Sequence, residues 1–228
     1  MSKQTIYLLI SIIILGLLVF IYPVNAQASN YQGLLEWMTG RILTVNDKMV
    51  DYRNDLEDSD KLNYYQARER AKNLIKAAKR YNHIYPNKSV KQALYEGMGI
   101  IETETRFVNF GKLDNGISFG FISMRWDTAQ WVANKLNENY DFVCNKENPS
   151  KEHMMSHKYD RWYLIEHTEK QANYFYYYYY TAAKKNNGDL RATAVCYNEG
   201  INVKIDKLEP KWRNYYFLVS GRVHEYKE

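Results

Sequence analysis

Cysteine is scarce in this chain, with only Cys144 and Cys196 among 228 residues. No cysteine lies near the end of the N-terminal apolar run, where a lipoprotein would need one, which argues against a lipid-anchored N-terminus. In an exported protein the two cysteines can form a single disulfide, although they lie far apart in the sequence. A buried free thiol is the alternative for Cys196, because that residue lies in an apolar stretch.

Several signals of other protein classes are also missing. The chain has no run of lysines and arginines, and its formal net charge of +5 is spread along its length, so no nucleic-acid partner is predicted. A mild positive charge suits an anionic polymer such as the cell wall. His153 and His157 have i, i+4 spacing and His167 follows, but there is no HExxH motif and no cysteine pair nearby, so no metal or other cofactor is predicted.

The composition is that of a folded protein, with 46% hydrophobic and 25% charged residues. The length suits one domain with an extension. Tyrosine is abundant at 22 residues, which reflects either codon bias or a surface that stacks on flat ligands such as sugars. The run Tyr176–Tyr180 must point in all directions around a helix, so packing is the default interpretation and some of its rings are expected at the surface.

The N-terminus predicts export. A continuous apolar run from Ile6 to Tyr22 follows Lys3, and signal-peptidase sites can end at Ala26 or Ala28. Residues 1–28 are therefore expected to be a cleaved signal peptide or an N-terminal anchor through residues 6–22. We expect the protein in the periplasm or cell envelope, either soluble after cleavage or anchored in the inner membrane.

Helical spacing of apolar residues recurs along the rest of the chain, with no tandem repeat and no strong alternating pattern. The fold class is therefore predicted to be mainly α. A helical extension is expected over residues 29–88, in which Ser59 or Asp58 caps the second helix. Ser89 caps the next helix, which runs through Glu104. Further helices are expected at about 126–140, 163–185, 190–198 and 211–226, with a short hairpin in 111–124 and an irregular segment over 141–163.

Two glutamates, Glu102 and Glu104, lie two positions apart near the end of the 89–104 helix. Residues two apart on a helix point about 200° apart, so only one of them can face a given cleft. A carboxylate at a helix C-terminus meets the negative end of the helix dipole, which favours its protonated form, as a general acid requires. Taken alone, the pattern is more typical of two solvated surface residues.

The order of five short motifs resembles the lytic transglycosylase (soluble-lytic-transglycosylase) domain of the lysozyme-like superfamily. The helix ends in "ETRF", where the family has Glu-Ser-x-Phe; "GFIS" stands at its Gly-Leu-Met-Gln block, and "DTA" at the Thr-Ala that follows. "AVCYNEG" stands at its Ala-Tyr-Asn-x-Gly block, and "RNYYFLV" is similar to the closing Arg-x-Tyr motif. The resemblance covers roughly residues 89–223 and implies a lysozyme-like domain over 89–228 that cleaves peptidoglycan glycan strands.

This resemblance implies that Glu104 is both acid and base. It would protonate the glycosidic oxygen between N-acetylmuramic acid and N-acetylglucosamine, and then take the proton of the muramoyl 6-hydroxyl as the 1,6-anhydro ring closes. Residues implied to bind substrate or to shape its site are Thr105, Phe107, Gly120, Phe121, Ser123, Tyr197, Asn198, Gly200 and Tyr215. The cellular context would be wall turnover or an envelope-spanning machine.

Two departures from the family pattern leave alternatives open. Ser123 stands where the family usually has Gln, and Trp126 where it usually has Pro. Asp114 could act as a second carboxylate, which would make the protein a hydrolytic muramidase, although an ordinary Asp-Asn-Gly turn is preferred. A peptidoglycan-binding or assembly protein that lost activity with its Gln is the third interpretation.

Overall fold

The computed structural model describes residues 31–53, 56–111, 113–203 and 210–227. Within these ranges the chain is mainly helical, which confirms the predicted fold class. None of the described helices is long and apolar enough to cross a membrane. The signal peptide or anchor predicted for residues 1–28 lies outside the described residues.

The first described helix covers residues 31–52 and is followed by α2 (Tyr64–Tyr81) and α3 (Val90–Glu104). Ser89 caps α3 as predicted, since its side chain accepts a hydrogen bond from the amide of Gln92. The predicted cap of α2 is wrong: Asp58–Asp60 forms a separate 3-10 turn, and Asn63 caps the helix through a capping box with Gln66.

A small hairpin follows α3, as the loop composition predicted. Strands β1 (Ser118–Phe119) and β2 (Met124–Arg125) pair antiparallel, with Ser118 opposite Arg125. The 3-10 turn η3 (Asp114–Gly116) precedes the hairpin, and α4 (Trp126–Lys135) follows it directly. Trp126 is the first residue of α4. Pro is favoured at this position in helices, and Trp in place of the family's Pro leaves the helix start intact.

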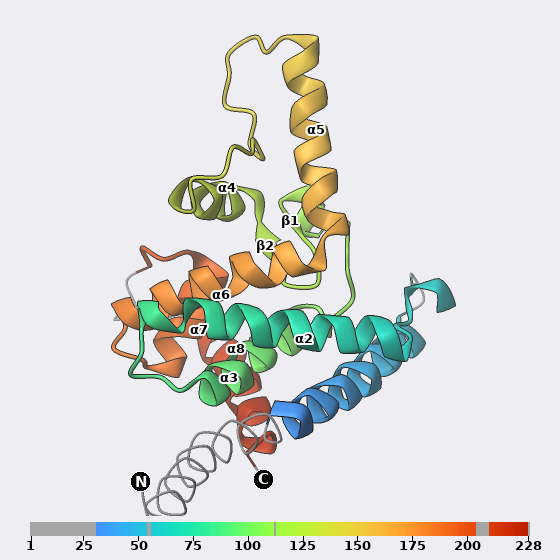
Figure 1. Cartoon of the computed structure of the whole chain (residues 1–228), viewed down its shortest axis with the longest axis vertical. Coiled ribbons are helices and arrows are strands. Elements are labelled where there is room, and N and C mark those ends of the chain that lie inside the picture. Colours follow the sequence, from blue (N-terminus) through green and yellow to red (C-terminus); the bar gives the residue numbers. More distant parts are fainter. Residues whose placement is uncertain (1–30, 54–55, 112, 204–209, 228) are drawn as a thin grey trace, which may run out of the picture.

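The segment after α4 differs from the prediction. Helix α5 (Lys151–Glu166) occupies much of the stretch expected to be irregular, and the predicted 163–185 helix breaks at His167, so that α6 spans Thr168–Lys185. Only Leu164 of α5 is buried, so its sequence carries no continuous apolar stripe. Figure 1 shows α5 and the loop before it rising together away from the other helices.

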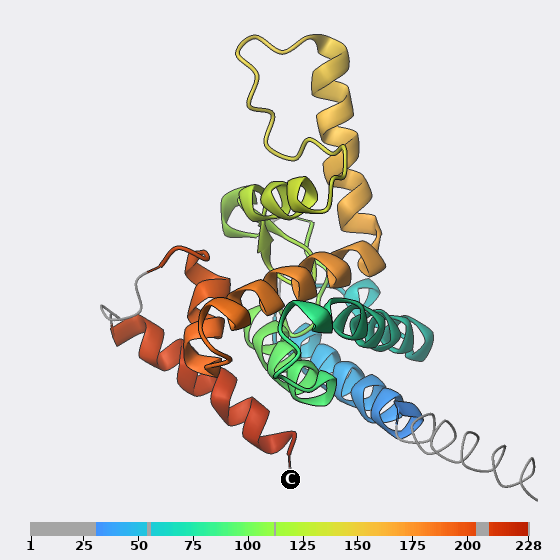
Figure 2. The ribbon, with the colours of Figure 1, turned by 60° about the vertical axis from the view of Figure 1, so that its left-hand side comes forward.

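Helix α6 lies at the centre of the molecule and packs against α2, α4, α5 and α7 (Figures 1 and 2). Asn187 and Gly188 end α6, with Gly188 at φ +79° and its amide bonded to the carbonyl of Ala183 at 2.8 Å. Helices α7 (Leu190–Glu199) and α8 (Pro210–Glu225) complete the fold, and α8 packs on α3 and α7.

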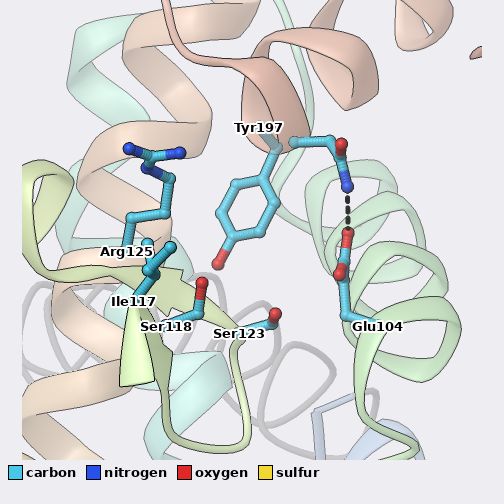
Figure 3. A pocket seen from close by; sticks show the side chains of 7 residues that line it. Glu104, Ile117, Ser118, Ser123, Arg125 and Tyr197 are labelled. Carbon is cyan, nitrogen blue, oxygen red and sulfur yellow. Dashed lines mark hydrogen bonds between the residues drawn. The ribbon is translucent and has the colours of Figure 1, made fainter. Parts of the chain in front are cut away.

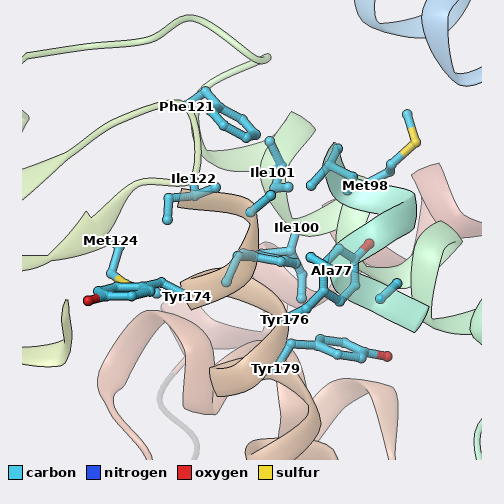
Figure 4. Packing of buried hydrophobic residues seen from close by; sticks show 14 of the residues in the cluster. Ala77, Met98, Ile100, Ile101, Phe121, Ile122, Met124, Tyr174, Tyr176 and Tyr179 are labelled. Atoms are coloured by element: carbon cyan, nitrogen blue, oxygen red, sulfur yellow. The ribbon is translucent and has the colours of Figure 1, made fainter. Parts of the chain in front are cut away.

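One continuous core joins all of these helices. Figure 4 shows the part of it where α2, α3, the hairpin and α6 meet. Met38 and Leu74 belong to the same buried cluster as Met98 and Tyr176, so the expected boundary at residue 88 falls inside this core. The tyrosine run is more buried than expected: Tyr176, Tyr178, Tyr179 and Tyr180 are buried, and only Tyr177 is partly exposed. These rings supply apolar bulk to the core rather than a sugar-stacking surface.

Candidate functional site

Glu104 lies at a pocket of about 290 Å³ whose walls come from three parts of the chain. It is the last residue of α3 and is half-buried. The hairpin contributes Ile117, Ser118, Ser123 and Arg125, and α7 contributes Tyr197 and Asn198 (Figure 3). Residues that are nearly a hundred positions apart therefore meet at this carboxylate.

Asn198 contacts Glu104 directly. Its Nδ2 atom donates a hydrogen bond to Glu104 Oε1 at 3.0 Å, drawn as the dashed line in Figure 3. This hydrogen bond fixes the orientation of the carboxylate. Asn198 thus holds the predicted acid in place.

Two tyrosines lie behind the carboxylate. The Tyr197 hydroxyl donates to the carbonyl of Ile122, which ties α7 to the hairpin. Burial first, and then the charge of Glu104, raise the pKa of Tyr197 and of Tyr215 on α8 well above the ordinary value. Both hydroxyls therefore remain protonated beside Glu104 at neutral pH.

Three residues that the resemblance implied at the substrate site are buried in the core and do not line the pocket. Thr105, Phe107 and Phe121 have no exposed surface. The Thr105 hydroxyl donates to the carbonyl of Phe121 and accepts from the amide of Phe107 at 3.2 Å. Thr105 therefore connects the end of α3 to the hairpin and supports Glu104 from below the pocket.

Gly120 also has a structural role, because it leaves room for the side chain of Gln171. The sequence motifs did not include Gln171. Gly120 has φ +78°, and a Cβ atom there would lie 2.2 Å from Oε1 of Gln171. Gln171 is fully buried on α6 and accepts from the amide of Phe121 at 3.0 Å, while its Nε2 donates to the carbonyl of Ile165 at 2.8 Å. No local sequence signal identifies Gln171, because its burial and its bonds to the hairpin appear only in the folded chain.

Ser123 and Gly200 take distinct positions. Ser123 lines the pocket and has φ +51°, a conformation uncommon for a residue with a side chain. Gly200 ends α7 with φ +100°, and its amide bonds to the carbonyl of Cys196 at 2.9 Å. Gly200 therefore shapes the end of α7, as the motif implied, and does not line the pocket.

The second-carboxylate prediction is not resolved. Asp114 stands in a turn with Asn115 at φ +58° and Gly116 at φ +86°, which agrees with the Asp-Asn-Gly turn preferred from the sequence. The side chain of Asp114 lies outside the described residues. Glu104 is the only carboxylate among the described residues that line the pocket.

Glu102 faces the opposite way, as helical geometry predicted. It is 1% exposed and lies between the 31–52 helix and α8, where it accepts hydrogen bonds from Arg41, Arg222 and the hydroxyl of Tyr226. The two glutamates line different cavities. Glu102 is therefore the centre of a buried ion cluster rather than a surface residue.

The expected disulfide does not form, because both cysteines are free. Cys196 is buried in α7, where its sulfur accepts from Asn186 Nδ2 at 3.3 Å, so the alternative of a buried free thiol is correct. Cys144 lies in the loop between α4 and α5, on the projecting part of the molecule, where its amide bonds to Asp141 Oδ1 at 2.9 Å.

No protein-family model, curated protein or solved structure matches this chain. The class of protein must therefore be argued from the pocket itself. A single carboxylate, oriented by an amide and backed by protonated hydroxyls, can donate a proton and take one back. The pocket also presents the hydroxyls of Ser118 and Ser123 and the guanidinium of Arg125, which are groups that can bind a polar, oxygen-rich ligand.

Proposed function

We propose that the protein is a peptidoglycan lytic transglycosylase of lysozyme-like fold, in which Glu104 is the only acid and base. The observation that carries this proposal is the meeting of Glu104 with Ser123, Tyr197 and Asn198 in one pocket. Three separate motifs of the family resemblance supply these residues. Two hydrogen bonds reinforce the arrangement, from Asn198 to Glu104 and from Tyr197 to the hairpin.

The chemistry follows from a lone carboxylate. Glu104 protonates the glycosidic oxygen as the bond from C1 of N-acetylmuramic acid breaks, and the substrate's own acetamido group stabilises the cationic sugar. The resulting carboxylate then accepts the proton of the muramoyl 6-hydroxyl while O6 bonds to C1. No water is consumed, so the second carboxylate that ordinary glycoside hydrolysis requires is not needed.

Digestion of purified peptidoglycan sacculi by the full chain tests this proposal. Mass spectrometry should detect 1,6-anhydro-muropeptides, and Glu104→Gln should lower their release by about 10²–10⁴-fold, the usual contribution of a general acid or base. Glu199→Gln is the matched control, because Glu199 is exposed on α7 next to the pocket residue Asn198. It should keep full activity.

Other products would identify the other interpretations. Reducing-end muropeptides without the anhydro form, lost in Asp114→Asn, would identify a hydrolytic muramidase. Binding to sacculi without product release, unchanged in Glu104→Gln, would indicate a peptidoglycan-binding or assembly protein, and the short reach of Ser123 into the pocket would then account for the missing activity.

A further inference from the structure

A second group of chemically active side chains lies far from Glu104, on the projecting part of the molecule. It consists of Asp141 and Cys144 in the loop before α5, and His153 and His157 on α5; we refer to these four residues as the arm cluster. One ligand atom each of Asp141, Cys144 and His157 lie within 4.8 Å of one another. The proposed transglycosylase reaction uses none of them.

The two histidines share one face of α5, because residues four apart lie one above the other on a helix. His157 lies against the loop that carries Asp141, with its Nδ1 4.0 Å from Asp141 Oδ1. Its Nδ1 lies 2.8 Å from the carbonyl oxygen of Asp141. A carbonyl oxygen only accepts hydrogen bonds, so Nδ1 carries the proton and Nε2 keeps its lone pair. In metal sites, a hydrogen bond of this kind from the second ring nitrogen orients the histidine ligand.

His153 supplies an independent observation. Its Nε2 atom lies 2.8 Å from Asp141 Oδ2, yet this buried nitrogen makes no hydrogen bond of acceptable geometry within the described part of the chain. The nitrogen and the carboxylate oxygen therefore lie side by side without a hydrogen bond between them, an arrangement that a shared cation explains. The side chains of His153 and His157 are 18% and 13% exposed, so water has limited access to both.

Hydrogen bonds hold the loop before α5 in position. Cys144 has φ +47°, an uncommon conformation for a residue with a side chain, and its amide bonds to Asp141 Oδ1 at 2.9 Å. Arg161 of α5 donates from Nε to the carbonyl of Phe142 at 2.6 Å. These bonds bring Asp141 and Cys144 against the histidines before any ligand binds.

We propose that the arm cluster binds one zinc-like divalent transition-metal ion, with Asp141, Cys144, His153 and His157 as its ligands. A set of one thiolate, two imidazoles and one carboxylate suits Zn²⁺ in tetrahedral geometry, whereas Mg²⁺ and Ca²⁺ prefer oxygen ligands alone. Binding releases the thiol proton of Cys144, and the charges of the thiolate and of Asp141 then balance those of the ion. Asp141, Cys144 and His157 would fill three positions, and His153, whose Nε2 lies 2.8 Å from Asp141 Oδ2, would fill the fourth, so the site would be structural.

The ion would fasten the loop over residues 136–150 to α5. That helix buries only Leu164, so little buried apolar surface holds it against the rest of the molecule. A metal link replaces the missing core of this projecting part, as metals do in other small structural units. His167 takes no part, because its ring stacks on Tyr163 at 3.8 Å and its Nδ1 bonds to the carbonyl of that residue.

The test uses the full chain loaded with Zn²⁺ or Co²⁺. X-ray absorption of the zinc form should give a first shell with one sulfur at about 2.3 Å and the remaining nitrogen and oxygen ligands at about 2.0–2.2 Å. The cobalt form should show a thiolate-to-metal charge-transfer band. Cys144→Ser should abolish this band and weaken zinc binding by more than about 100-fold, since loss of an outer-shell partner alone costs 10–100-fold.

Two matched variants test the assignment. Cys196→Ala removes the other thiol and His167→Gln removes a histidine just beyond α5, and both should keep the band and one zinc per chain. A zinc shell without sulfur, or a cobalt band that survives in Cys144→Ser, would overturn the proposal. The absorption experiment needs no variant, so it decides the question even if Cys144→Ser does not fold.

Discussion

Replacing Glu102 with Gln removes the charge at the centre of a buried ion cluster without changing side-chain size. Glu102 is 1% exposed and accepts bidentate hydrogen bonds from Arg41, at 2.9 Å from Nε and 2.8 Å from Nη2. Burial opposes the charge of Arg41, but the hydrogen bond and charge of Glu102 outweigh it and raise the pKa of that guanidinium. The cluster joins the 31–52 helix to α3 and α8.

The expected cost follows from the burial of the carboxylate. Removing one partner of a buried ion pair costs about 3–5 kcal/mol, because the remaining charge is left uncompensated. Arg41 and Arg222 keep 28% and 22% of their side-chain surface in contact with solvent, which places the estimate at the lower end, about 3 kcal/mol. For a chain of this length that corresponds to a fall in Tm of roughly 6–12 °C.

Thermal unfolding followed by circular dichroism, with urea unfolding beside it, measures the effect. The urea midpoint should fall without a change in slope. Glu225→Gln is the control, because Glu225 pairs with the same Arg41 at 3.1 Å but is 62% exposed. A surface pair contributes only about 0–1 kcal/mol. Equal losses in Glu102→Gln and Glu225→Gln would refute the buried-cluster reasoning.

Three further predictions concern the pocket and the core. Gly120→Ala should lower the free energy of unfolding by about 2–4 kcal/mol in urea titrations, because the methyl group displaces Gln171 and the left-handed backbone is strained; unchanged stability would contradict the close approach. Asn198→Ala should lower muropeptide release by roughly 10–100-fold, since a hydrogen bond to a charged group contributes about 1.5–3 kcal/mol; full activity would show that Glu104 needs no orienting amide. Burial raises the pKa of Tyr180 to about 12, against about 10 in an unfolded chain, so its contribution to stability is complete below pH 10 and is lost as the pH rises toward 12. Urea midpoints should therefore fall between pH 10 and 12, and less steeply in Tyr180→Phe; equal slopes would contradict this account.

Local signals predicted most of the helical order. Ser89 and Asp189 start α3 and α7 by accepting the amides of Gln92 and Ala192, as capping rules require. The stripe of Leu94, Met98 and Ile101 is fully buried. These features depend on residues within one or two turns of each other, so they are encoded locally.

Helix α5 shows where periodicity fails. Met155, Tyr159 and Trp162 are all more than half exposed, because this helix projects from the body and buries almost nothing. The signal that remained was Ser150, whose side chain accepts from the amide of His153 at 3.2 Å as an N-cap. A helix without a buried face gives no apolar period to detect.

The candidate site was only partly accessible from the sequence. Family-like motifs singled out Glu104, Ser123, Tyr197 and Asn198, and these four do meet in one pocket. The motifs could not separate residues that line this pocket from those beneath it, such as Phe121, because both kinds lie in the same short blocks. Burial depends on which helix packs over the hairpin.

By itself, the sequence determined the helical class, most helix ends and the divergence of Glu102 from Glu104, because each follows from backbone geometry over a few residues. Tertiary packing alone decided what each position faces. It placed Gln171 under the hairpin, surrounded Glu102 with two arginines, left both cysteines free and brought Asp141 beside His153. Such contacts join residues from 12 to 120 positions apart, and chain folding, not local preference, sets their distances.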